Sequence, residues 1–245
     1  MREYRADLHV HSCLSPCGEL EMSPRAIVEK SLERGMDIIA LCDHNSAENV
    51  GAVMRAGAER GLCVFPGMEV NSVEEVHSLA LFETEKQALA MQETIYRHLR
   101  GSNRAEIFGD QVVANEFDEV EGFNDRLLIG AVQLKLQEVV NEVHRLGGLS
   151  IASHVNKQSF SVIAQLGFIP PDLEFEALEI SRHMKREEVA GSLPGAEGYR
   201  IVTSSDAHFL EEIGTVWTTF LLESPSLNEV RMALKESSGR RMLEN

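Results

Sequence analysis

Short apolar stretches alternate with amphipathic stretches along most of the chain. The apolar stretches have the length of strands, whereas the amphipathic ones repeat their apolar positions at helical spacing. The predicted strands are residues 5–11, 36–43, 62–70 (broken near Pro66), 76–82, 149–154, 176–181, 199–208 and 215–222. The predicted helices are residues 23–35, 46–61, 83–100, 134–148, 159–166 and 226–237.

This alternation of strand and helix predicts an α/β fold built on a parallel sheet of βα units. About seven units in 245 residues favour a barrel over an open sheet, although periodicity alone does not decide between them. We predict a single domain over residues 1–245, with a helical and loop insertion at 84–146. Within it, residues 101–126 are polar and poorly periodic, which predicts an inserted or mobile loop.

Composition is that of an ordinary soluble globular domain, with 43% hydrophobic and 25% charged residues. No apolar run approaches the ~18 residues of a membrane span, and the N-terminus lacks a signal-peptide pattern. We therefore expect a cytoplasmic protein without a membrane partner. The net charge of −16 argues against a long nucleic-acid partner, because such surfaces are usually basic. Bound divalent metals would nevertheless make one pocket locally positive.

The chain has four cysteines, and nothing in the sequence predicts a disulfide framework. Cys42 and Cys63 lie in apolar runs and are expected to be buried packing side chains. Cys13 and Cys17 are three residues apart. Without a second pair nearby, they do not predict a structural zinc or iron–sulfur site.

Acids and histidines gather where the predicted strands begin or end. In a barrel, catalytic groups collect at the carboxyl ends of the strands, and side chains two residues apart on a strand share a face. The residues at strand boundaries are Asp7, His9, His11, Asp43, His44, Glu69, His77, His154, Asp206 and His208. Imidazole and carboxylate together favour zinc, iron or manganese, and six histidines are too many for one ion. His98 and His144 lie inside helical patterns and are expected to be surface or packing residues.

Six motifs, in this order, resemble those of the PHP (polymerase and histidinol phosphatase) superfamily: "ADLHVHS", "LCDHN", "GMEVN", "VHSLALF", "IASHV" and "SSDAH". The resemblance implies a distorted (β/α)7 barrel with two or three divalent metal ions, zinc, manganese or iron. It implies a first metal site at His9, His11, Glu69 and Asp206, a second at Glu69, His77 and His154, and a third that includes His44 and His208.

The chain departs from the family pattern in "HSCLSPCG". Many family members read like "HTxxSDG" there, with an acid or histidine that serves the third metal. Cys17 is the nearest donor in this chain and Glu19 the next, because Pro16 cannot ligate a metal. Cys17 is therefore expected to be a third-site ligand. The alternatives are a reactive or structural thiol, and a centre with only two metals.

The resemblance implies a metal-dependent phosphoesterase acting on a small phosphorylated substrate such as a nucleotide or histidinol phosphate. We hypothesise that a hydroxide bridging two metals attacks phosphorus. His44 and His208 would stabilise or protonate the leaving oxygen. Asp7 and Asp43 would orient ligand imidazoles, with Asp43 counted among the catalytic residues.

Substrate contacts are expected from Lys157, Arg182 and His183, which follow predicted strands where barrel loops could reach a phosphate. Three alternatives remain. The first is a nuclease or phosphodiesterase acting on short oligonucleotides. The second is hydrolysis at carbon, which no lysine at a matching strand end supports. The third is a metal-binding module whose catalysis has decayed, which the intact ligand set disfavours.

Overall fold

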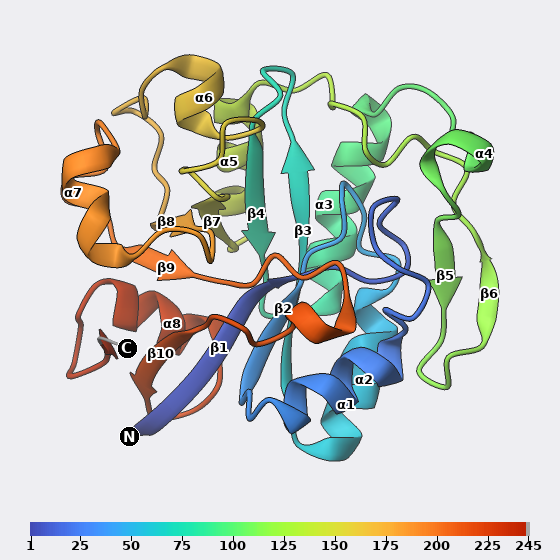
Figure 1. Cartoon of the computed structure of the whole chain (residues 1–245), viewed down its shortest axis with the longest axis horizontal. Coiled ribbons are helices and arrows are strands. Elements are labelled where there is room, and N and C mark those ends of the chain that lie inside the picture. Colours follow the sequence, from blue (N-terminus) through green and yellow to red (C-terminus); the bar gives the residue numbers. More distant parts are fainter. Residues whose placement is uncertain (244–245) are drawn as a thin grey trace.

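The computed structural model describes residues 1–243, apart from the side chain of residue 190 (Figure 1). In this range a nine-stranded sheet has the order β11-β10-β1-β2-β3-β4-β7-β8-β9, and β5 and β6 form a separate hairpin. The strands are β1 Arg2–Val10, β2 Ile38–Leu41, β3 Cys63–Asn71, β4 His77–Leu81, β5 Val112–Ala114, β6 Val120–Phe123, β7 Leu149–Ala152, β8 Ala177–Ile180, β9 Ile201–Thr203, β10 Thr218–Leu222 and β11 Arg241–Leu243. The helices are α1 Pro24–Glu33, α2 Val50–Arg60, α3 Glu85–His98, α4 Ala105–Phe108, α5 Leu136–Arg145, α6 Val162–Leu166, α7 Val189–Ser192 and α8 Leu227–Leu234.

The large sheet curls toward a barrel. A parallel bridge between Val10 and Ala207 links β1 to the chain just beyond β9, so seven strands, β1–β4 and β7–β9, form the curled part. The predicted α/β barrel is confirmed. The prediction of a parallel sheet is wrong at β4, which is antiparallel to both β3 and β7. The five residues between β3 and β4 are too few for the crossover that parallel neighbours require.

Local sequence signals account for the main helix ends. Pro24 takes the first position of α1 after Ser23, where its missing N–H costs nothing. Thr84 and Gln87 form a reciprocal capping box at the start of α3. Gly61 closes α2 with a φ of 80°, a left-handed conformation that favours glycine. None of the helices in residues 1–243 is long and apolar enough to cross a membrane.

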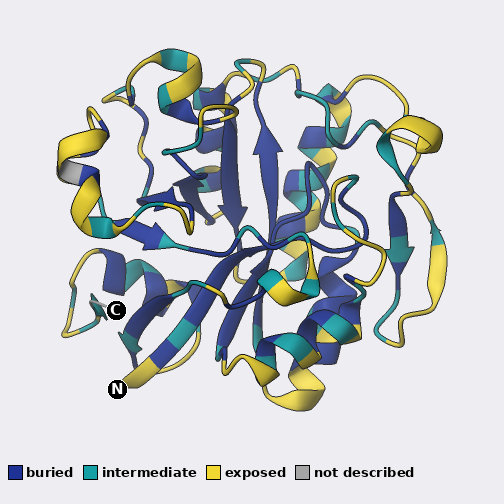
Figure 2. Cartoon of the chain, in the orientation of Figure 1, coloured by how far each residue is buried: buried dark blue, intermediate teal, exposed yellow. Residues whose placement is uncertain are grey.

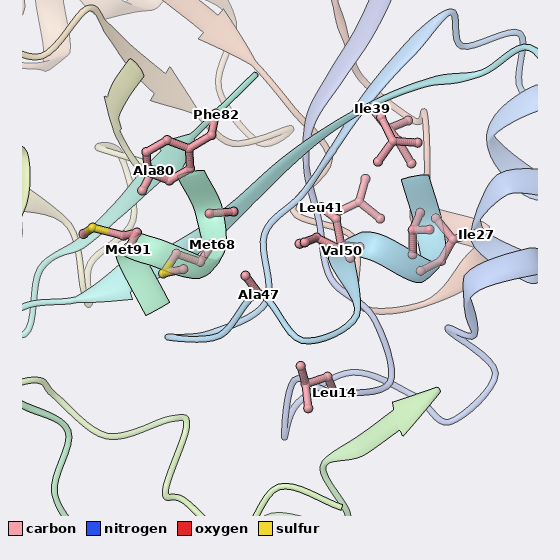
Figure 3. Close-up of a cluster of buried hydrophobic side chains, with 14 of the residues drawn as sticks. Leu14, Ile27, Ile39, Leu41, Ala47, Val50, Met68, Ala80, Phe82 and Met91 are labelled. Atoms are coloured by element: carbon pink, nitrogen blue, oxygen red, sulfur yellow. The ribbon is translucent and has the colours of Figure 1, made fainter. Parts of the chain in front are cut away.

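Three hydrophobic clusters hold the sheet in place, one of which packs α5 and α6 against β7, β8 and β9. The inner cluster joins side chains such as Leu8, Phe65 and Ile151 from the curled strands with α8. The outer cluster packs α1, α2 and α3 against β2, β3 and β4, and includes Ile39 and Met68 (Figure 3). The strands at the centre are accordingly buried, while helix faces and β6 are exposed (Figure 2). This rigid frame positions the loops at the strand ends.

Three local predictions are wrong. β3 runs unbroken through Pro66. Proline has no N–H to donate, but the Pro66 carbonyl still accepts a hydrogen bond from the Phe82 N–H at 2.8 Å, which keeps the residue in the sheet. The strand predicted at 199–208 is regular only over Ile201–Thr203. Residues 101–126 contain α4 and the β5–β6 hairpin rather than only loop. The Asn49 side chain ties β5 to the body through bonds to Val112 O and Ala114 N, each 3.0 Å.

Candidate metal centre

The end of β1 brings two fully buried histidines together. The Nε2 atoms of His9 and His11 lie 3.1 Å apart. The pairing of β1 with β2 shifts register between Asp7 and Val10. The Asp7 carboxylate accepts hydrogen bonds from the N–H groups of Ser205 and Gly214, each at 2.9 Å. Asp7 thus anchors the backbone beside Asp206, and its role in orienting a ligand imidazole stays a prediction.

Glu69, almost completely buried in β3, lies at the middle of the cluster. Its carboxylate is surrounded by five imidazoles from four strand ends. The nearest ring nitrogens lie 3.1 Å away for His77 and His154, 3.2 Å for His44, 3.5 Å for His9 and 3.6 Å for His11. The two carboxylate oxygens divide these rings between them, which is the arrangement that a bridging carboxylate needs.

Asp206 and His208 complete the cluster from the chain after β9. The Asp206 Oδ1 atom lies 3.3 Å from His11 Nε2 and 3.4 Å from His9 Nε2. The His208 ring stacks on that of His11, with centroids 4.2 Å apart. Lys157 forms an ion pair with the other oxygen of Asp206. A cation of the protein thus lies at the edge of the cluster.

Two of these residues have strained backbone. His154 has a φ of 28° and Asp206 a φ of 54°, in a region that L-residues rarely adopt, at a cost of up to about 1–2 kcal/mol each. Aspartate and histidine are found there more often than most residues, but neither position is a glycine. The surrounding packing must therefore enforce these conformations, which direct both side chains into the cluster.

The donor set fits divalent metal ions. Three groups have ligand atoms within 4.8 Å of one another: His9, His11 and Asp206; His44, Glu69 and His77; His11, His44 and His208. Among residues 1–243, the buried Nδ1 atoms of His44 and His77 have no hydrogen-bond partner, although both face the Glu69 carboxylate. Buried polar atoms are normally satisfied, and mixed imidazole and carboxylate donors suit zinc, manganese or iron.

Electrostatics favour the protonation states that bind a metal for both carboxylates and for His11. For His9, burial would lower the pKa, but the charges of Glu179, Asp206 and Glu69 outweigh it and raise the pKa well above its usual value, so a metal bound there must displace a proton. Burial would raise the pKa of Glu69, but the charges of His77 and His9 hold that pKa well below its usual value. The pKa of Asp206 is also held well below normal, because the charge of His9 and a hydrogen bond from His11 outweigh burial. Burial and the neighbouring His208 lower the pKa of His11 to about 3. The carboxylates are thus ionised and His11 is neutral, as ligands must be.

Sequence reasoning missed Glu179, which contacts the cluster from β8. Its side chain is buried, lies 3.0 Å from His9 Nδ1, and accepts a hydrogen bond from the His154 N–H at 3.0 Å. The signal was a glutamate between Leu178 and Ile180 in an apolar strand. A carboxylate behind a ligand imidazole fixes the ring orientation and raises its basicity.

Asp43 acts on the cluster through a serine. The Ser15 hydroxyl lies 2.9 Å from His11 Nδ1 and donates a hydrogen bond to Asp43 at 2.7 Å. Ser12 also donates to Asp43, through its N–H at 2.7 Å and its hydroxyl at 2.6 Å. Asp43 is fully buried. It is therefore placed to hold Ser15 and His11, and not to touch a substrate.

Cys17 lies outside the three ligand groups found among the described residues. The residue is exposed, but its thiol lies deep enough for desolvation, with the charges of Glu69 and Asp206, to raise its pKa to about 12. Glu19 is also exposed and outside these groups. The group that contains His44 and His208 includes His11, and a third-site role of Cys17 stays a prediction.

His98, His144, Cys42 and Cys63 do not belong to the ligand groups found among the described residues. His98 lies 2.9 Å from the Thr94 carbonyl of its own helix, and His144 pairs with Glu176 at 3.2 Å. Cys42 is buried as predicted, whereas Cys63 is only partly buried.

Two pockets flank the cluster and share Lys157, Asp206 and His208 in their walls. The larger, of about 280 Å³, is also lined by Cys17, Arg182, His183 and Phe209, among others. The smaller, of about 180 Å³, reaches His44, Glu69, His77, His154 and Phe160. All three predicted substrate contacts therefore line the larger pocket. Arg182 also donates a hydrogen bond to Glu212 at 2.7 Å, which holds its guanidinium at the pocket wall.

Comparison with known protein families gives two matches. The PHP domain matches residues 7–168, and the PHP-associated family matches residues 196–238. An uncharacterized protein of Methanocaldococcus jannaschii is 26% identical over 159 residues, which cover 57% of this chain and 93% of that protein.

Solved structures share the fold at low sequence identity. The lesion-specific endonuclease Q of Pyrococcus furiosus superposes with a TM-score of 0.68 at 18% identity, covering 98% of this chain. A protein of Bifidobacterium adolescentis described as a metal-dependent phosphoesterase has a TM-score of 0.59 at 18% identity, covering 95% of this chain and 96% of that one. The chain spans 58% of the length of the endonuclease.

One of these neighbours corrects the prediction about partners. A structure of endonuclease Q in complex with a 27-mer duplex carrying an abasic lesion at its active site matches this chain with a TM-score of 0.70 at 17% identity. The prediction that only small substrates and no long nucleic acid bind is therefore wrong. Net charge averages over the whole surface, whereas bound metals and a few cations set the local potential of a pocket.

The PHP domain match alone covers more than half of the sequence, and it contains most of the residues around Glu69. Members of this superfamily are metal-dependent hydrolases. This chain accordingly belongs to the PHP domain family.

Proposed function

We propose that this protein hydrolyses phosphoesters at the Glu69 centre, which comprises His9, His11, His44, Glu69, His77, His154, Asp206 and His208. The supporting observation is one buried carboxylate surrounded by five imidazoles, beside a second carboxylate and a lysine. Divalent metals bound there would lower the pKa of water and neutralise charge on the phosphoryl group. Zinc, manganese and iron are the candidate ions.

The proposed ligand assignment follows the observed groups. His9, His11 and Asp206 would hold one ion, and His44, Glu69 and His77 a second, to which His154 is added by its 3.1 Å approach to Glu69. His208, with His11 and His44, would either hold a third ion or remain free to act on the leaving group. Glu179 and Ser15 would fix the orientation of the rings of His9 and His11.

Residues of the pocket walls would bind and orient the substrate. The ammonium group of Lys157 lies at the junction of the two pockets, within reach of a phosphoryl oxygen bound beside Asp206. Arg182 and His183 line the larger pocket, where a planar guanidinium suits a phosphate. His208 is partly exposed in both pockets and is the candidate proton donor to the leaving oxygen.

Two substrate classes compete. The resemblance in the sequence favours a phosphomonoester such as a nucleotide or histidinol phosphate. The likeness of the fold to endonuclease Q, over 98% of this chain, favours a nucleic-acid phosphodiester as the second candidate. Both reactions need the same metals and the same charge neutralisation at phosphorus.

A direct assay tests the proposal. The purified protein is stripped with EDTA, reloaded with zinc, manganese or ferrous iron, and assayed on monoesters, model diesters, single strands and a duplex with an abasic site. We expect phosphate or strand release that EDTA abolishes and one of the metals restores. A double variant, His9→Ala with Glu69→Ala, should be inactive, whereas His98→Ala serves as a control on a histidine remote from the centre. Full activity in the double variant contradicts the mechanism.

A further inference from the structure

Two exposed phenylalanines line the two pockets beside the Glu69 centre, one in each. Phe160 is 39% exposed and lines the smaller pocket, and Phe209 is 44% exposed and lines the larger one. Large apolar side chains that stay exposed beside a polar site lose the benefit of burial. A ligand bound in both pockets would cover these two side chains.

The Phe160 ring is held in place by its surroundings. It stacks on the His77 ring, with centroids 4.7 Å apart and planes inclined by 21°. The Phe160 carbonyl accepts a hydrogen bond from the His77 N–H at 2.8 Å, and the next residue, Ser161, donates one to Lys157 O at 2.7 Å. The φ of Phe160 is 57°, which is a genuine outlier for a bulky residue. The fold thus maintains a strained conformation that presents this ring at the pocket.

Two cations lie in the pocket walls, each paired with a carboxylate: Lys157 with Asp206 and Arg182 with Glu212. Bound divalent metals would offset the carboxylates and leave these cations to meet a phosphate. The pockets share Lys157, Asp206 and His208, so the candidate catalytic groups lie between the two rings. Arg182 adds a second cation on the Phe209 side. A substrate that fits this layout has a central phosphate and a flat apolar group on each side. A phosphodiester between two nucleosides has this form, and bases of any sequence stack on aromatic rings.

We infer that Phe160 and Phe209 are stacking platforms for the two nucleobases that adjoin a scissile phosphodiester. This inference rests on the proposed phosphoester hydrolysis at the Glu69 centre and gives it a substrate class, a nucleic-acid strand with a base on each side of the cleaved linkage. Recognition by stacking is tolerant of sequence, since every base has a π face.

The test uses two fluorescein-labelled oligothymidylates that each contain one cleavable phosphodiester between methylphosphonate linkages. In one strand the two nucleotides at that linkage carry bases, and in the other both are abasic. Phe160→Ala and Phe209→Ala are compared with Phe168→Ala, whose phenylalanine is 54% exposed and lines neither pocket. Metal content and thermal midpoint are measured for each variant, because Phe160 touches His77.

We expect each pocket variant to lower kcat/KM on the base-bearing strand by about tenfold, mainly through KM. The loss on the abasic strand should be several times smaller, Phe160→Trp should restore cleavage, and Phe168→Ala should match the unaltered protein. Equal losses on both strands, or losses no larger than that of Phe168→Ala, would overturn the inference.

The two proposals fail in different ways. If the protein hydrolyses monoesters but neither strand, the inference is wrong and the phosphoesterase proposal stands. If the metal-loaded protein hydrolyses no phosphoester, the proposed function fails. Fluorescence anisotropy with the same strands and variants then decides the inference: weaker binding of only the base-bearing strand in the two alanine variants supports it, and unchanged binding overturns it.

Discussion

The two halves of the curled sheet supply the same centre in different ways. In the β1–β3 half, β1 and β3 are nine residues long, and His9 and Glu69 project from within them. In the β7–β9 half the strands have three or four residues, and two ligand candidates, His154 and Asp206, follow the strand ends at positive φ. The register of β1 and β3 fixes His9 and Glu69, whereas His154 and Asp206 depend on turns at positive φ that packing must hold. The Glu69 centre thus combines donors held by long strands with donors held by strained turns.

The largest effect is expected where the halves meet. Glu69 from β3 contacts His154 from the other half. In Glu69→Gln the amide cannot supply the negative charge that faces five imidazoles, so we expect metal loss and a fall in kcat/KM of at least about 10³-fold. Metal analysis and the phosphoester assay measure both. Glu176→Gln is the control, since Glu176 pairs with His144 away from the centre. Retained activity in Glu69→Gln would contradict the claim that Glu69 joins the ligands of the two halves in one centre.

The second prediction concerns Glu179, which belongs to β8 but holds His9 of the other half. Glu179→Gln should weaken metal binding about 10–100-fold, as changes behind ligand imidazoles do. Calorimetric titration of the stripped protein with zinc or manganese gives the affinity. An unchanged affinity would mean that the β1 half orients its own ligands without help from β8.

Whether a residue of the Glu69 centre could be predicted from the sequence depends on what positions it. Donors at strand ends could be predicted from alternation and from the family motifs, because both depend on local sequence. The contacts of Glu179, Ser15 and Asp7 could not be predicted, because they depend on packing between segments distant in the sequence. The β5–β6 hairpin was missed for a related reason: its short strands lack a clear period, and Asn49 of a distant segment holds it. The ligand role of Cys17 was predicted from its place in the chain, whereas the group around His44 and His208 contains His11, which comes from the end of β1.

A smaller effect should reveal the backbone strain at His154. Both His154→Asn and His154→Ala remove the ring, but asparagine tolerates left-handed backbone better than alanine. The asparagine variant should therefore be more stable than the alanine variant by about 1 kcal/mol in metal-free urea unfolding. The same pair of substitutions at His11, whose φ is not among the positive values in the described chain, should show no such advantage. Equal stabilities at residue 154 would contradict the strained half of the comparison.

The smallest effect is expected at Cys17. Because its thiol lies outside the ligand groups of the described residues, Cys17→Ser should leave the number of bound metals unchanged. Hydrolysis should stay within about twofold, as for substitutions away from buried or ligating positions. Mass spectrometry of the native protein counts the ions. Loss of one ion per chain in Cys17→Ser would show instead that Cys17 is a ligand of a third metal ion.

The central claim is that Glu69 lies between two bound metal ions, and that both halves of the sheet supply the ligands of these ions. A crystal of the metal-loaded protein, with anomalous data collected on both sides of the metal edge, tests it directly. We predict one peak among His9, His11 and Asp206, and a second beside Glu69 and His77. Absence of both peaks from a protein that still hydrolyses phosphoesters would contradict the account.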